Sequence, residues 1–227
     1  MRVCAIIVAE GSGKRFGSRI PKQFHVLGKK PVLAHVLYRF DSSPIINGIC
    51  LVVKKKAIEM VRKKIVQRYN FKKVCMVIGG GKERQDSVYN GLINIGDNWD
   101  VVMVHDGVRP FINDQLISKV AKAAMRCGAA IPGIKVRDTV KAVNDYDKIV
   151  ETVNRENLWL AQTPQAFRYE ILKKSYEKAR REKYTGTDDA MLVEKAGYKV
   201  IVIEGLRSNI KITTAEDLRT LILLSNG

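Results

Sequence analysis

The chain has 227 residues, of which 46% are hydrophobic, so it is long enough for one compact domain and too short for two full ones. Forty Lys and Arg residues against twenty-three Asp and Glu residues give a net charge of +17, which favours anionic partners over cationic ones. No apolar stretch approaches the length of a membrane span, and the first residues lack the pattern of a secretion signal, which excludes an integral membrane protein. Four widely spaced cysteines without metal-ligand spacing indicate reduced thiols and a cytoplasmic protein.

The excess positive charge is concentrated in residues 53–73 and 171–183. Apolar residues recur there at helical spacing, so we interpret both segments as helices with solvated basic faces. A basic nucleic-acid-binding protein is the alternative reading of the charge. Few aromatic residues are interleaved with the cations to stack on bases, which favours a protein without a nucleic-acid partner.

In chain order, short β-branched apolar runs alternate with amphipathic stretches. Strands are expected at 3–8, 48–53, 74–78 and 100–105, and helices at 31–40, after Lys54, at 84–95 and at 113–128. Strands that are apolar throughout are covered on both faces, so the pattern predicts an α/β fold with a mainly parallel twisted sheet and helices on both sides. Ligands of such Rossmann-like sheets bind at the carboxyl ends of the strands.

The alternation breaks at residues 136–159, which read as two strands around the turn NDYD with little to bury. We expect a single domain over 1–227 whose β-arm, 137–158, packs on a second subunit, because an isolated two-stranded ribbon is marginally stable. A long edge hairpin on its own domain is the alternative. Helices at 168–182 and 187–196, strands at 199–205 and 209–213, and a closing helix from Thr214 complete the prediction.

The first strand leads into the turn IIVAEGSGKRFG, which resembles two phosphate-binding motifs and matches neither. In a P-loop, Ser or Thr would follow Lys14, where Arg15 stands, and glycine would replace Val8. In a dinucleotide-binding turn, glycine would replace Phe16. The remaining interpretation is a glycine-containing loop whose backbone amides approach a triphosphate, with Lys14, Arg15 and Lys22 neutralising its charge.

Seven motifs occur in one order along almost the whole chain: AEGSGKRFGSRIPKQF, GGGKERQDSV, VHDGVRPF, VRDTVK, NRENLWLAQTPQAF, TDDA and EGLRSNIKIT. Together they resemble the 2-C-methyl-D-erythritol 4-phosphate cytidylyltransferase family. The resemblance implies a homodimer that joins CTP and the polyol phosphate into CDP-methylerythritol and pyrophosphate, with a divalent cation, usually Mg²⁺. Two anions meet in that reaction, so positioning and cations dominate catalysis and no protein nucleophile is required.

The resemblance also implies residue roles. Arg15, Lys22 and Lys211 match the catalytic cations, and Asp106 matches the ligand of the metal. Arg109 matches a residue that contacts the acceptor, whereas Thr139 and Arg155 match acceptor-binding residues supplied by the arm of the neighbouring subunit. His105 is expected to orient its turn rather than to transfer a proton. The residues expected to contact the nucleotide are Ala9, Glu10, Gly11, Ser12, Gly13, Gly80, Gly81, Ser87 and Asp106.

The chain departs from the family pattern at a few of these positions. Glu10 replaces a small residue beside the nucleotide, Lys82 stands where many members carry an acid, and Gly107 and Val108 replace two alanines. A carboxylate near a triphosphate is unfavourable unless it points away, pairs with a cation or helps to hold the metal, so Glu10 poses a question for the structure. A cytidylyltransferase for another polyol phosphate, such as ribitol 5-phosphate, stays open as an alternative; VRDTVK followed by NRENLW favours methylerythritol phosphate.

Overall fold

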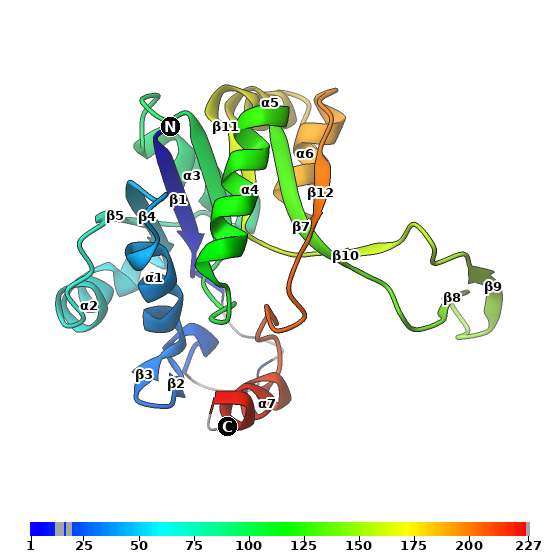
Figure 1. The fold of residues 1–227 in the computed structure, drawn as a ribbon, viewed down its shortest axis with the longest axis horizontal. Coiled ribbons are helices and arrows are strands. Elements are labelled where there is room, and N and C mark those ends of the chain that lie inside the picture. The colour runs from blue at the N-terminus through cyan, green and yellow to red at the C-terminus, as the bar shows by residue number, and fades with distance from the viewer. Residues whose placement is uncertain (12–15, 17–19, 226–227) are drawn as a thin grey trace.

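The structure is a computed structural model of the chain, and it describes residues 1–11, 16 and 20–225. Within this part of the chain the central sheet has eight strands (Figure 1). They are β1 (Val3–Val8), β4 (Gly48–Val53), β5 (Val74–Gly79), β6 (Val101–Asp106), β7 (Ala129–Lys135), β10 (Trp159–Ala161), β11 (Gln165–Arg168) and β12 (Ile201–Glu204).

The sheet is mainly parallel, as the sequence predicted. Strands β6, β1, β4 and β5 lie side by side in that order and run in one direction. Strand β12 is parallel to β7, whereas β11 is antiparallel to both β6 and β7, and β10 is antiparallel to β7. The carboxyl ends of four neighbouring parallel strands therefore meet at one edge of the sheet.

Alternate residues of β1 separate the two sides of the core. Ala5 and Ile7 face one apolar cluster, and Ile6 faces the other, because successive side chains of a strand point to opposite faces. Helices α1 (Val32–Ser42) and α4 (Asp114–Cys127) cover the first face, together with α2 (Ile58–Val61) and the π-helix Arg62–Gln67 that continues it. Helices α3 (Arg84–Asn94), α5 (Tyr169–Arg181) and α6 (Asp189–Lys195) cover the second face.

The ends of α4 illustrate how the sequence sets the helix boundaries. The Asn113 side chain accepts a hydrogen bond from the backbone N–H of Leu116 at 2.9 Å, which satisfies one of the free amides of the first turn. Gly128 ends the helix at a φ of 94°, a conformation that residues with a side chain rarely adopt. The amphipathic segment between these residues was predicted to be helical, and that prediction is confirmed.

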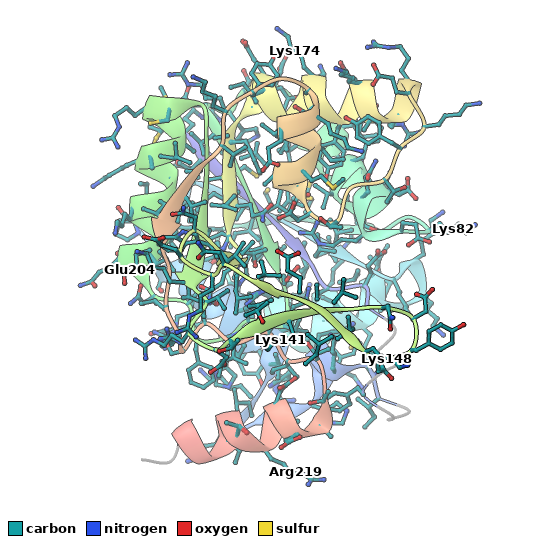
Figure 2. The ribbon with its side chains drawn as sticks, turned by 90° about the vertical axis from the view of Figure 1, so that its right-hand side faces the viewer. Lys82, Lys141, Lys148, Lys174, Glu204 and Arg219 are labelled. Atoms are coloured by element: carbon teal, nitrogen blue, oxygen red, sulfur yellow. The ribbon has the colours of Figure 1, made fainter. Side chains whose placement is uncertain are left out.

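The segment 137–158 projects from the body as an arm (Figure 1). It carries the antiparallel strands β8 (Val140–Val143) and β9 (Ile149–Val153), which pair only with each other among the described residues. Figure 2 looks along the arm and shows Lys141 and Lys148 on it, in front of the body. The exposed side chains of the arm include Tyr146 and Ile149, so most of this hairpin contacts no core within the chain.

Near the C-terminus, one predicted element is wrong and one is confirmed. Residues 209–213 were expected to form a strand, but they follow an irregular path in which the Ile212 N–H donates to the Val108 carbonyl at 3.0 Å. The backbone N–H groups of Ile210, Ile212 and Thr213 donate to Ser208, to Val108 and to the Asp217 side chain, and none of them pairs with a strand, which is why these β-branched residues do not join the sheet. Helix α7 (Ala215–Ser225) begins after Thr214, whose hydroxyl accepts the N–H of Asp217 at 3.2 Å.

A small additional cluster lies beneath α7. It combines Phe16, Leu27, Val32, Val108 and Ile212 with Leu218. The short strands β2 (Val26–Leu27) and β3 (Lys30–Pro31) and the one-turn helix Lys22–Phe24 also belong to this part of the chain. The cluster places the loop after β6 against the segment that carries Lys211.

Candidate active site

A cavity of about 790 Å³ opens at the carboxyl ends of β1, β4, β5 and β6. This is the edge at which open α/β sheets bind ligands. Its lining combines small residues with several cations and three carboxylates: Val8, Ala9, Glu10, Gly11, Lys22, Gln23, Lys54, Lys55, Gly80, Gly81, Lys82, Glu83, Arg84, Asp106, Val108 and Lys211.

Asp106, the last residue of β6, is the centre of an ionic cluster in this cavity. Its side chain is only 8% exposed. Lys211 Nζ lies 2.9 Å from Oδ2, Arg109 Nε lies 3.4 Å from the same oxygen, and Arg84 Nε lies 3.4 Å from Oδ1. Two of these cations, Lys211 and Arg109, were predicted as site residues. The structure brings them together from positions about one hundred residues apart.

The cluster keeps Asp106 ionised. Burial alone would raise the pKa of this carboxyl, but Arg84, Lys211 and Arg109 outweigh burial and hold the pKa well below its usual range. Burial also lowers the pKa of Arg109, and Asp106 opposes that effect. Asp106 is therefore one carboxylate among three cations, and the cavity lining as a whole carries more lysine and arginine side chains than carboxylates, which favours an anion as its ligand.

His105 is buried beneath the same turn. Its Nε2 lies 3.2 Å from the Arg109 carbonyl and its Nδ1 lies 3.1 Å from the Thr163 hydroxyl. Burial lowers the pKa of His105 to about 4, so the ring is neutral near pH 7. With both nitrogens engaged by the protein, the histidine orients the turn after β6, which agrees with the role expected of it.

Arg84 was not predicted as a site residue, and its place depends on a second buried carboxylate. Arg84 NH2 lies 2.8 Å from Asp189 Oδ2, and the Tyr176 hydroxyl donates to the same carboxylate. Burial by itself lowers the pKa of Arg84, but the negative charges of Asp189 and Asp106 outweigh burial, so the pKa is raised. The TDDA motif could have pointed to this contact, because two adjacent carboxylates at a helix start are a site for a cation.

The segment that carries Lys211 is fixed through Arg109 and Asn209. Arg109 NH1 donates to the Asn209 carbonyl at 2.8 Å, and Asn209 Nδ2 donates to the Thr163 carbonyl at 2.8 Å. Arg109 thus contacts protein on two sides and does not line the cavity itself. Within the described residues, its observed contacts position Lys211 beside Asp106.

Gly107, one of the departures from the family pattern, lies close to the first strand. Its N–H donates to the Val8 carbonyl at 2.8 Å. A Cβ at this position would come within 2.8 Å of the Ala9 Cβ, closer than side-chain carbons normally approach. Glycine therefore permits the loop after β6 to pack tightly against the end of β1.

The glycine turn after β5 leads into α3. The N–H of Gly80 donates to the Val53 carbonyl at 2.8 Å, and the N–H of Gly81 donates to the Ser87 hydroxyl at 2.9 Å. Glu83 and Asp86 form a capping box at the start of the helix, in which each side chain accepts a backbone N–H. Ser87 is fully buried, so within the chain it supports the turn by holding Gly81.

Glu10 points toward this turn. One carboxylate oxygen lies against Gly80, in the place that a Cβ would occupy, and close to the Ser87 hydroxyl, which donates to the Glu83 carbonyl at 3.0 Å. Gly80 has no side chain and therefore leaves room for the carboxylate of Glu10. Lys82, the other departure in this region, is exposed and lies at the edge of the body in Figure 2.

Lys22 and the residue that follows it lie close to the end of β1. Lys22 begins the short helix Lys22–Phe24 and lines the cavity, with its Cε 3.8 Å from where a Cβ on Gly11 would lie. The following residue, Gln23, is buried and donates to the Ala9 carbonyl at 2.7 Å, which ties this helix to the end of β1. Predicted site residues Ser12, Gly13 and Arg15 lie outside the described residues.

Thr139 and Arg155 are not part of this cavity. Thr139 is exposed on the arm, and the Arg155 guanidinium donates to the Arg137 carbonyl. Arg155 instead lines a second cavity of about 420 Å³ at the base of the arm, together with Lys135, Arg137 and Arg207. A single chain therefore does not bring the predicted acceptor-binding residues of the arm to the cations around Asp106.

Sheet topology, glycine turns and a cationic cavity at the strand ends together define an α/β phosphate-binding protein of the nucleotidyltransferase class. The family described as 2-C-methyl-D-erythritol 4-phosphate cytidylyltransferase (IspD) matches residues 3–223. The chain belongs to this family.

Individual relatives agree over nearly the full chain. The 2-C-methyl-D-erythritol 4-phosphate cytidylyltransferase of Syntrophus aciditrophicus is 46% identical over 96% of this chain and 93% of the relative. Its counterpart in Geobacter metallireducens is 44% identical over 96% of this chain and 95% of the relative. Among solved structures, 4-diphosphocytidyl-2C-methyl-D-erythritol synthase from Anaerococcus prevotii superposes with a TM-score of 0.86 at 32% identity, covering 100% of this chain and 96% of that one. The cytidylyltransferase from Thermus thermophilus gives a TM-score of 0.82 at 31% identity over 100% of both chains.

Among the described residues, no helix combines the length and the apolar character that a bilayer crossing needs.

Proposed function

We propose that this protein transfers the cytidylyl group of CTP to the phosphate of 2-C-methyl-D-erythritol 4-phosphate. A phosphate oxygen of the acceptor bonds to the α-phosphorus of CTP, and the bond from that phosphorus to the oxygen bridging to the β-phosphate breaks. CDP-methylerythritol forms and pyrophosphate leaves with the electron pair. Membership of the family over residues 3–223 supports this assignment.

The cluster of cations around Asp106 carries the proposal. An attack of one phosphate on another needs cations that offset like-charge repulsion and the charge that develops on the leaving group. Lys211 and Arg84 supply them in the cavity at the carboxyl end of the sheet, both held by Asp106, and Arg109 positions the segment that carries Lys211. No step requires a nucleophile from the protein.

Within this proposal Lys22 and Lys211 contact the phosphates directly. Both line the cavity, and Lys211 is 40% exposed, so its ammonium group is accessible to an anion. Arg15, which lies outside the described residues, is assigned the third catalytic contact from its place in the motif GKRFG. Ala9, Gly11, Gly80 and Gly81 present backbone to the nucleotide, since they carry small or no side chains at the end of the cavity.

A divalent cation such as Mg²⁺ fits Asp106. Magnesium is commonly held by one or two carboxylates together with phosphate oxygens of the substrate, and Asp106 is an ionised carboxylate that lines the cavity. The described residues contain no group of three or more His, Cys, Asp or Glu side chains suited to a metal, which agrees with a cation held mainly by the substrate. When bound, the metal would neutralise phosphate charge, and Asp106 would exchange one of its cationic neighbours for it.

We assign the arm the role of a dimerisation element that completes the partner's site. Its exposed apolar residues, Val143, Tyr146, Ile149 and Val150, are unfavourable in water and suit a second copy of this chain. Thr139 and Arg155 would then contact the acceptor bound to the other subunit. A cytoplasmic location is supported by the four cysteines, all of which are free thiols.

The test is pyrophosphate release from CTP and Mg²⁺, run in parallel with methylerythritol 4-phosphate and with ribitol 5-phosphate. Release with the first acceptor alone is the expected result. Release with ribitol 5-phosphate alone would keep the chemistry and overturn the acceptor. Absence of release with both would overturn the proposed function, provided that circular dichroism shows a folded protein.

A further inference from the structure

We propose that Glu10 reads the base of the nucleotide, its carboxylate accepting a hydrogen bond from the exocyclic amino group of cytosine and disfavouring the carbonyl that uracil presents at the same place. The inference rests on the proposed function, because it assumes that the cavity holds a nucleoside triphosphate. It assigns a specificity role to a side chain at which this chain departs from its family pattern.

The Glu10 carboxylate has a defined place in the cavity. Glu10 lines the main cavity, and its side chain crosses from the end of β1 to the turn after β5. There it lies in the space that a side chain on Gly80 would fill, close to the Ser87 hydroxyl. The missing side chain of Gly80 thus gives the carboxylate its place beside the turn.

The Glu10 carboxylate lies away from Lys211. Lys211 contacts Asp106 at the end of β6, and Gly80 follows β5; β1 and β4 lie between these two strands. At the usual spacing of strands, the ends of β6 and β5 are roughly 14 Å apart. Among the described residues, Arg84 alone reaches Asp106 from the side of the glycine turn, at the start of α3. A triphosphate bound at Lys211 therefore places its base, and not its phosphates, near Glu10, which removes the repulsion expected of a carboxylate beside a triphosphate.

The backbone of the glycine turn has no free N–H at Gly80 or Gly81, because these groups are already bonded to the Val53 carbonyl and the Ser87 hydroxyl. Donors in this part of the lining come from the lysine side chains of Lys54, Lys55 and Lys82, whereas the carboxylate at Gly80 is an acceptor. A carboxylate there matches the amino group of cytosine and repels the carbonyl oxygen of uracil.

The charge state of Glu10 is compatible with this role. Burial and the carboxylates of Asp86 and Glu83 raise the pKa of Glu10, and the Ser87 hydroxyl and the charge of Lys54 oppose that shift without cancelling it. A hydrogen bond from the amino group of a bound base would lower the pKa of Glu10 and favour its charged form.

The decisive experiment compares kcat/KM for CTP and for UTP in the wild type, Glu10→Gln and Glu10→Ala. Glutamine keeps the shape of the side chain but can present its NH₂ group to the uracil carbonyl, so we expect the CTP-to-UTP ratio to fall about tenfold or more. Glu10→Ala is expected to lower kcat/KM for CTP and to leave that for UTP unchanged or higher. Glu59→Gln, a change on the exposed face of α2 where Glu59 pairs with Arg62, is the matched control and should leave the ratio unchanged.

An unchanged ratio in folded Glu10→Gln overturns the inference. So does a rise of kcat/KM for CTP in Glu10→Ala, because it would mean that Glu10 obstructs the base. Should Glu10→Ala fail to fold, the isosteric Glu10→Gln decides alone.

Calorimetric titration with CTP and with UTP, without any acceptor, separates this inference from the proposed function. A preference for CTP that Glu10→Gln removes would support Glu10 as the base-reading residue even if no pyrophosphate were released. Equal binding of CTP and UTP by the wild type would overturn the inference even if the enzyme were active.

Discussion

Replacing Asp106 by Asn removes the only carboxylate that faces Lys211, Arg84 and Arg109 together among the described residues, and we expect the variant to unfold more easily. The substitution keeps the shape of the side chain and deletes its charge. Lys211 and Arg109 would then lose their carboxylate partner, and Arg109 is largely buried, whereas Arg84 would keep its ion pair with Asp189.

The structure indicates the size of the loss. Removing one partner of a buried ion pair costs about 3–5 kcal/mol, whereas solvent-exposed pairs contribute little. Lys211 is 40% exposed and Arg84 is 30% exposed, so water screens both, but Arg109 is only 11% exposed. We therefore expect Asp106→Asn to lower the free energy of unfolding by about 3 kcal/mol, the lower end of that range. For a chain of this size, this corresponds to a decrease in Tm of roughly 6–12 °C.

The dependence on pH tests the cause of the loss. The pKa of Asp106 is depressed in the folded protein, so its contribution is fully present above the pKa of an unfolded Asp, about 4, and declines as the pH falls toward the folded value. Urea unfolding should show the full difference between wild type and Asp106→Asn at pH 7 and a smaller one near pH 3. Asp145→Asn, on the exposed tip of the arm, is the control. Equal stabilities of wild type and Asp106→Asn at pH 7 would refute the reasoning.

Three further predictions concern the other parts of the site. Lys22→Ala should lower kcat by about 10²-fold or more, with folding and calorimetric CTP binding nearly unchanged, because its charge acts on the reacting phosphates; unaltered turnover would contradict its catalytic role. Arg155→Ala should raise the KM for the acceptor at least tenfold more than the KM for CTP, and equal effects on both in steady-state kinetics would exclude its place at the acceptor. His105 is buried, and its pKa is lowered to about 4 in the folded protein. As the pH falls below about 6.5, this histidine therefore takes up a proton in the unfolded chain before it does so in the folded protein. The free energy of unfolding should lose roughly 3 kcal/mol from this residue by pH 4, and a pH titration of urea unfolding that is equally steep in His105→Gln would argue against it.

Local pattern was sufficient for most of the fold. Runs such as residues 48–53 are apolar throughout, and a strand of that kind is stable only between two layers of helices, so the mainly parallel sheet followed from the sequence. The strand expected at 209–213 was wrong, because its β-branched residues bond to loops and to the start of α7 and not to a neighbouring strand. Strands β7, β10 and β11 were not predicted, since proline and glycine or polar residues interrupt their apolar pattern and their pairing is decided by distant partners.

Motifs likewise identified most candidate site residues but not their arrangement. Asp106, Lys22 and Lys211 were predicted and line one cavity. Arg84 and Asp189 were missed although each lies in a quoted motif, because the fold alone decides that two residues 105 positions apart form an ion pair. The roles expected of Arg15, Thr139 and Arg155 remain predictions.

By itself, the sequence determined the class of fold, the family and the residue types that meet the phosphates, because periodicity, motif order and charge are properties of the chain before it folds. Tertiary structure decided which charges neutralise one another and where Glu10 points. These depend on burial and on contacts between strand ends that are far apart in the chain: Asp106 stays ionised because three cations surround it, and Glu10 is tolerated because Gly80 leaves room for it.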